Sequence, residues 1–128
     1  METTSAQSIF PVMTNDIISI NGVEYAPVQP KLAENIFVIR SYAAGVFYGE
    51  IESKDYTASG LVVKAKNVKR IWSWSGACSL SQLATNGVAD GTRISVSVPS
   101  EEIINVVEIL GVTPKALKSL EAQPIWKK

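Results

Sequence analysis

Residues 61–74 read LVVKAKNVKRIWSW, and this stretch decides the fold. Residues 61–65 are mostly apolar and β-branched, and residues 69–74 alternate in polarity, as strands do. Asn67 lies between the two runs, and asparagine is common in turns. The stretch therefore predicts two neighbouring strands with a turn near Asn67.

Two hairpins are predicted upstream of this stretch. Asn21-Gly22 separates two short apolar runs within residues 17–26, and both turn residues tolerate a positive φ, so this is a strong hairpin signal. The β-rich segments 36–42 (IFVIRSY) and 46–52 (VFYGEIE) form the second hairpin, in which Gly45 is available for the left-handed position of a short turn.

Two short helices are predicted in the C-terminal half. The first spans residues 79–86 (SLSQLATN), with its first serine as N-cap and Gly87 as the left-handed stop. The second begins at Thr113-Pro114, an N-cap followed by proline at the first helical position, and runs to about Glu121. The tail at residues 124–126 (PIW) is expected to dock by its indole.

Between the helices, residues 93–98 (RISVSV) alternate as a strand does. Residues 103–110 (IINVVEIL) are ambiguous, because some of their apolar positions fit a helical stripe while five β-branched residues favour extension; we interpret them as a strand. We expect an α+β fold with a mostly antiparallel sheet of about six to eight strands and two short helices. Residues 1–16 are expected to be a flexible N-terminal arm and residues 17–128 a single α+β domain.

The amino-acid composition limits the partners and the kinds of catalytic or metal site that the chain could have. Lys+Arg and Asp+Glu are both 12, so no overall charge draws the chain to nucleic acid or to an anionic membrane. The chain has no histidine, the usual general base and a common metal ligand, and Cys78 is its single cysteine. We therefore expect no catalytic residue, metal or cofactor. A single cysteine suits a reducing cytoplasm, and no apolar run is long enough to span a bilayer, so we expect a soluble intracellular protein.

The first candidate binding site is in the stretch quoted above. In a regular strand Arg70, Trp72 and Trp74 project from one face and form a shelf. Such a shelf suits a nucleobase, because base–aromatic stacking is worth about 1–3 kcal/mol, and arginine pairs with phosphate. The alternative is that the indoles cover the core under a helix, with the arginine at the margin.

Further cations and a phenol lie near the second hairpin. Arg40 and Tyr42 stand close to two glycines, which permit close approach of a ligand to the backbone, although these glycines equally suit a turn and a bulge. Lys69 belongs to a local basic run that either tracks phosphates or forms a solvated strand edge. The candidate ligand-binding residues are Arg40, Tyr42, Lys69, Arg70, Trp72 and Trp74.

Four motifs extend over most of the chain: INGVEY at residues 20–25, RSYAAGVFYG at 40–49, KRIWSWSGA at 69–77 and SLSQLATNG at 79–87. Together they resemble a family of small tailed-bacteriophage proteins that share a domain of unknown function. The resemblance covers about residues 17–126, and Lys69 stands where the family often has arginine. It implies no activity, cofactor or catalytic residue.

The resemblance supplies a phage context, and small phage proteins without enzyme motifs commonly act by binding, so we expect a non-enzymatic bacteriophage accessory protein in the host cytoplasm. We expect it to act in counter-defence or host takeover by sequestering a small anionic, nucleotide-like ligand or a host protein. Strand edges in a small apolar domain also predict a homo-oligomer. The alternative is a structural or virion-associated packing module.

Overall fold

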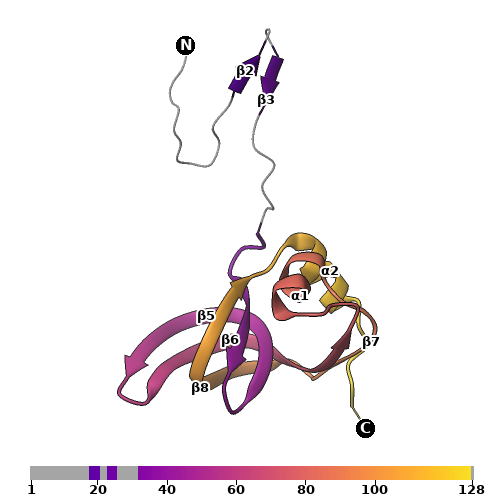
Figure 1. Ribbon diagram of the computed structural model, residues 1–128. Helices are drawn as coiled ribbons and strands as arrows, with labels where there is room; N and C mark the ends of the chain where they lie inside the picture. Colours follow the sequence, from indigo (N-terminus) through magenta and orange to yellow (C-terminus); the bar gives the residue numbers. More distant parts are fainter. Residues whose placement is uncertain (1–17, 21–22, 26–31, 128) are drawn as a thin grey trace. The chain divides into compact units, whose positions relative to one another are not determined.

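The computed structural model describes residues 18–20, 23–25 and 32–127, and the chain divides into two units, residues 1–30 and 31–128. In the first unit, β2 (Ile18–Ile20) and β3 (Val23–Tyr25) pair antiparallel, as Figure 1 shows. Their antiparallel register agrees with the predicted hairpin, whose Asn21-Gly22 turn lies outside the described residues. The flexible arm and its boundary at residues 16 and 17 fall outside the described residues.

The second unit contains a sheet and two helices. Its elements are β4 (Ile36–Ser41), β5 (Gly45–Thr57), β6 (Gly60–Ser75), α1 (Leu80–Asn86), β7 (Ala89–Ile94), β8 (Val98–Gly111) and α2 (Pro114–Glu121). The strands form a five-stranded antiparallel sheet in the order β5-β4-β8-β6-β7. The α+β class, the antiparallel sheet and the two short helices are confirmed, whereas the expected six to eight strands were too many.

One reason for the lower count is that β6 is continuous where two strands and a turn were predicted. Asn67 has a φ of +50° and forms a bulge, not a turn. The register shows the extra residue, because Tyr48 of β5 faces Lys69 whereas Glu50 faces Lys66. A bulge bends a strand while pairing continues on both sides. At the same crossing, a Cβ on Gly49 would lie 2.8 Å from Val68 Cα, so glycine is required there.

The continuity of β6 closes the sheet on itself. One edge of β6 pairs with β5 along most of the strand, and the other edge pairs with β8 over residues 61–68 and then with β7 over residues 71–75. Because β5 also pairs with β4, and β4 with β8, these four strands form a ring. Figure 1 shows β5, β6 and β8 as strongly curved strands, as closure of a small sheet requires.

Part of the sheet is buried on both faces. Val38 and Ile39 are neighbours in β4 and both are fully buried, because Ile39 faces the interior of the ring and Val38 faces the helices. The inner cluster consists of Ile39, Phe47, Val63, Ala65, Val68, Ile103 and Val106. The outer cluster consists of Val38, Tyr48, Ile71, Leu83, Ala84, Ile94, Val112, Ala116 and Leu120.

Both helices form as predicted. Ser79 caps α1 by accepting a hydrogen bond from the backbone N–H of Gln82, and Thr113 caps α2 in the same way. Gly87 ends α1 at a φ of +94°, and a Cβ there would collide with Ser119 of α2, so the two helices pack closely. Neither described helix has the length and apolar character that a membrane crossing requires.

The chain between the helices differs in part from the prediction. The strand expected over residues 93–98 was wrong, because β7 ends at Ile94 and β8 begins at Val98. Residues 103–110 are a strand, as interpreted. Their helix-like spacing arises because Asn105, at a φ of +53°, adds a residue between the buried Ile103 and Val106.

The bulge at Asn67 gives a test of the fold. Asn67→Val should lower the free energy of unfolding by about 1–2 kcal/mol, because a β-branched residue disfavours the left-handed backbone region. Asn67→Gly should cost less, since it loses only the side-chain hydrogen bond from Asn67 Nδ2 to Glu50 Oε2 and keeps the backbone conformation. Urea unfolding measures both. Lys66→Val, at the neighbouring exposed position, is the control, and an equal loss in all three variants would contradict the assignment.

Candidate functional site

Two tryptophans and two arginines form a cluster that we call the Arg–Trp surface: Arg70, Trp72, Arg93 and Trp126. Arg70 is half-buried, with its guanidinium also 4.8 Å from the Phe47 ring, and the other three residues are exposed. The two indoles meet edge to face, with ring centroids 5.9 Å apart and an interplanar angle of 71°. The Arg70 guanidinium lies 4.9 Å from the Trp72 ring, and that of Arg93 lies 5.2 Å from the Trp126 ring. Trp72 is 53% exposed and Trp126 is 48% exposed, so much of this aromatic surface faces solvent.

Backbone pairing holds three separate segments together at this surface. Arg93 lies opposite Ser73 in the β6–β7 pair, next to Trp72. The tail forms a parallel bridge from Ile125 to Ile94, and the backbone N–H of Trp126 donates to the Ile94 carbonyl over 2.8 Å. The tail therefore docks through its backbone, and its indole, by which docking was expected, contacts Trp72 edge to face.

Trp74 does not belong to the Arg–Trp surface. Its ring is partly buried and packs against the outer cluster, to which Ile71 belongs. Its Nε1–H donates to the Ala77 carbonyl over 3.1 Å. The β6–β7 register shifts on both sides of Ser73, which breaks the simple alternation expected of residues 70–74. The structure thus separates the two indoles, and Trp74 takes the core position that was the alternative for both.

Arg40 lies apart from Arg70, and Tyr42 lies in the turn after β4, where its backbone N–H donates to the Asn105 carbonyl of β8 over 3.0 Å. Residues directly opposite each other in antiparallel strands share a face of the sheet. Arg40 faces Val46, which faces Ile71, whereas Arg70 is the neighbour of Ile71 and projects from the other face. Arg40 Nε contacts Glu108 Oε1 of β8 at 3.3 Å. The structure therefore places Arg40 and Arg70 on opposite faces.

Lys69 lies beside a buried phenol. Its Nζ is 5.8 Å from the centre of the Tyr48 ring, which belongs to the outer core. The Tyr48 hydroxyl is buried and has no hydrogen-bond partner among the described residues. Burial raises the pKa of this hydroxyl far above its usual value, and the carboxylate of Glu121 adds to the rise. Lys69 and Arg70, although adjacent, therefore serve different faces of β6.

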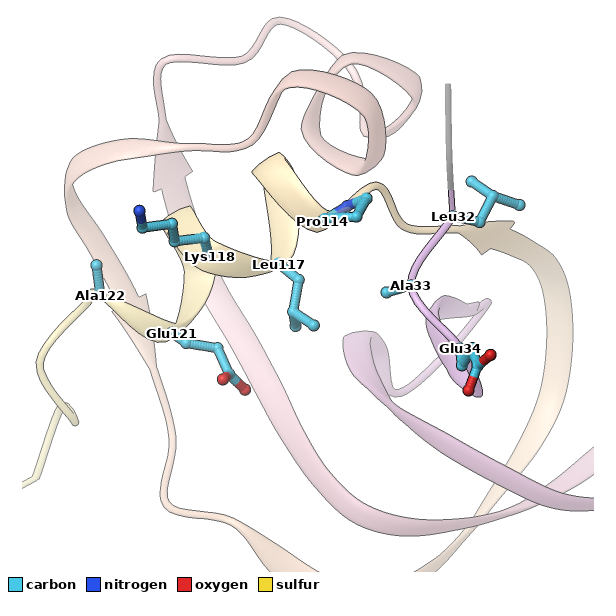
Figure 2. A pocket seen from close by; sticks show the side chains of 8 residues that line it. All are labelled: Leu32, Ala33, Glu34, Pro114, Leu117, Lys118, Glu121 and Ala122. Atoms are coloured by element: carbon cyan, nitrogen blue, oxygen red, sulfur yellow. The ribbon is translucent and has the colours of Figure 1, made fainter. Parts of the chain in front are cut away.

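An open groove of about 700 Å³ lies between residues 32–34 and α2. Figure 2 shows Leu117 pointing into it, with the carboxylates of Glu34 and Glu121 on either side. Its lining residues are Leu32, Ala33, Glu34, Pro114, Leu117, Lys118, Glu121 and Ala122. None of the residues proposed from the sequence lines this groove.

The geometry defines a small α+β domain with a closed antiparallel sheet, two helices on its outer face and an exposed Arg–Trp surface. Within the described ranges, no group of three or more acidic or cysteine side chains lies close enough to hold a metal ion.

The chain belongs to the family described as Domain of unknown function (DUF6948), which matches residues 34–120. No curated protein and no solved structure matches the chain. The matched region includes Arg70, Trp72 and Arg93 but ends before Trp126. Half of the aromatic surface therefore comes from the tail beyond the matched region.

Sequence reasoning found Arg70 and Trp72 but did not propose Arg93 or Trp126 as site residues. Both are distant from Trp72 in the sequence, and only the pairing of β7 with β6 and with the tail brings them together. An aromatic residue in a segment expected to dock was the one available signal.

The buried phenol gives a prediction. Tyr48→Phe should raise the free energy of unfolding by up to about 1 kcal/mol, because it removes a buried hydroxyl that lacks a partner. In the parent protein, stability should also fall as the pH rises above about 10, since the unfolded chain ionises this phenol first. Tyr48→Phe should lose that part of the decline. Thermal unfolding against pH measures both effects. The exposed Tyr56→Phe is the control, and identical profiles for the two variants would contradict the assignment.

The contact between the indoles gives a second prediction. Trp72→Ala should speed hydrogen exchange at the Trp126 amide, because its bond to the Ile94 carbonyl loses the packing that protects it. Val96→Ala removes an exposed apolar side chain outside the Arg–Trp surface and should leave the rate unchanged. NMR measures the hydrogen-exchange rate of the Trp126 backbone amide in both variants. Equal rates in the two variants would show that the tail docks without Trp72.

Proposed function

We propose that this protein acts by binding, without catalysis, and that its Arg–Trp surface takes a partner protein. The observation that carries the proposal is the pair of half-exposed indoles in edge contact, each with a guanidinium over its ring. Tryptophan and arginine dominate the energetic centres of protein interfaces. Covering two large rings with a partner also removes much apolar area from water.

The charge of the surface specifies the partner further. Among the described residues, neither Arg70 nor Arg93 forms a salt bridge; Arg40, on the other face, does. Guanidinium groups stacked on rings keep their N–H donors in the plane of the group, where they match a carboxylate. We therefore propose that the partner presents acidic side chains next to an apolar patch.

The second candidate is a small anionic ligand of nucleotide type. It is supported by the stacked guanidiniums, which could hold a phosphate while a base stacks on an indole. A partner protein is better supported, because small molecules bind in concave sites that bury most of their surface. Neither indole lines the groove shown in Figure 2.

The setting we propose is the cytoplasm of a bacteriophage-infected cell, where the protein would serve counter-defence or host takeover. This part of the proposal rests on the resemblance of the four motifs to small phage proteins. A structural or virion-associated role is the alternative, and its mark would be the presence of the protein in purified particles.

Native mass spectrometry of the protein recovered from bacterial lysate tests the proposal. We expect a co-purified host protein that is lost from the double variant Trp72→Ala, Arg93→Ala. The matched control is Lys54→Ala with Tyr56→Ala, which removes one exposed cation and one exposed aromatic ring from β5.

Loss of a small-mass adduct, instead of a protein, from the first variant alone would favour the second candidate. Equal retention of the bound species by both double variants would contradict a role for the Arg–Trp surface.

A further inference from the structure

The groove between residues 32–34 and α2, which we call the acidic groove, is complementary in character to the Arg–Trp surface. Five of its eight lining residues are apolar: Leu32, Ala33, Pro114, Leu117 and Ala122. Glu34 and Glu121 are exposed, and Figure 2 shows their carboxylates on either side of the Leu117 side chain. An apolar floor between two carboxylates complements aromatic rings that carry guanidinium groups.

The lining of the acidic groove also includes one cation, Lys118. Figure 2 shows its amine on the other side of α2 from the Leu117 side chain, away from both carboxylates. Among the described residues, neither Glu34 nor Glu121 forms a salt bridge. Within this part of the chain, both carboxylates are therefore open to a guanidinium of another molecule.

Both walls of the acidic groove are fixed at the end of β8. The Ala33 N–H donates to the Val112 carbonyl over 2.6 Å, and a Cβ on Gly111 would lie 2.8 Å from Leu32 Cδ1. The opposite wall, α2, begins at its cap Thr113, directly after Val112. An occupant therefore meets a preformed site, which lowers the entropic cost of binding.

Arg70 and α2 lie on opposite sides of β6. Ile71 belongs to the outer cluster, together with Ala116 and Leu120 of α2. Its neighbour Arg70 instead lies over Phe47 of the inner cluster, with 4.8 Å between guanidinium and ring. Because α2 forms one wall of the acidic groove, the Arg–Trp surface of one copy does not meet its own groove, and only another copy can join the two.

We propose that the Arg–Trp surface of one copy of this chain docks in the acidic groove of the next copy. The indoles lie on the apolar floor, and the guanidinium groups pair with Glu34 and Glu121. The inference rests on the binding role proposed for the Arg–Trp surface and names a second copy as an occupant. Lys+Arg and Asp+Glu are both 12, so no net charge opposes the association.

Such a contact joins two different surfaces, so it is a heterologous interface. It leaves a free groove at one end and a free Arg–Trp surface at the other, and further copies can add as an open chain or close into a ring. Because a groove of about 700 Å³ takes only a few side chains, the interface is small and the oligomer is in exchange with the monomer.

Sedimentation equilibrium over increasing concentration tests the association. The mean mass of the parent protein should rise above that of the monomer. The groove variant, Glu34→Lys with Glu121→Lys, should stay monomeric, because like charges then meet across the contact. Glu52→Lys with Asp55→Lys makes the same charge change at exposed positions of β5 and should associate as the parent does. A parent protein that stays monomeric up to ~1 mM, or a groove variant that associates normally, would overturn the proposal.

Mixing two variants tests the head-to-tail arrangement. The Arg–Trp variant, Trp72→Ala with Arg93→Ala, keeps the acidic groove, whereas the groove variant keeps the Arg–Trp surface. Each should be monomeric alone, and an equal mixture should form a 1:1 complex that does not grow, since one intact contact remains. Circular dichroism checks that both variants are folded. A mixture of folded variants that stays monomeric would overturn the proposal.

Loss of self-association is distinguishable from loss of the binding role. A parent protein that is monomeric, yet retains a host protein through Trp72 and Arg93, would overturn the self-association and leave the binding role standing. Self-association that the groove variant keeps and the Arg–Trp variant loses would show that two Arg–Trp surfaces pair with each other, and would overturn the role of the acidic groove.

Discussion

Asn67 holds a left-handed backbone conformation in the middle of a sixteen-residue strand, and the closed sheet depends on this residue. The bulge adds one residue to β6 relative to β5, so the strand bends while both of its edges stay paired. Before the bend β6 pairs with β8, and after it with β7. The bend curves β6 within the ring that it forms with β5, β4 and β8, as closure of a small sheet requires.

Closure also determines where the helices lie. The ring encloses one cluster of apolar side chains, so the outer face of β4 and β5 needs a second cover. The helices supply it by packing on the side to which Val38 and Tyr48 point. Trp74 joins this outer layer, whereas Trp72 faces solvent, because the register with β7 shifts beyond Ile71. The same irregularities that shape the sheet thus select which aromatic residues are available to a partner.

The elements whose signals are local could be predicted from the sequence. Asn21-Gly22, the caps Ser79 and Thr113, and the stop at Gly87 each act within a few residues, and the structure contains the hairpin and both helices. Asn67 could not be assigned correctly, because an asparagine between two apolar runs suits a turn as well as a bulge. Only the partner strands decide between these two structures.

The same distinction between local and long-range signals applies to the residues of the candidate site. Arg70 and Trp72 were accessible to sequence reasoning because they are neighbours in one strand, whereas Arg93 and Trp126 reach them through pairing that no local pattern specifies. Simple alternation along β6 also grouped Trp74 with Trp72, and the register shifts on both sides of Ser73 separate them. Arg40 and Tyr42 belong to another surface, beside β8.

Interstrand nuclear Overhauser effects along β6 test this account most directly. They should connect β5 to residues 60–66 and to residues 69–71, with β8 contacting the first segment on its other edge and β7 contacting residues 71–75. Such a pattern requires one continuous strand through Asn67. Contacts between residues 61–65 and residues 69–74 would instead place a hairpin turn at Asn67 and would contradict the closed sheet.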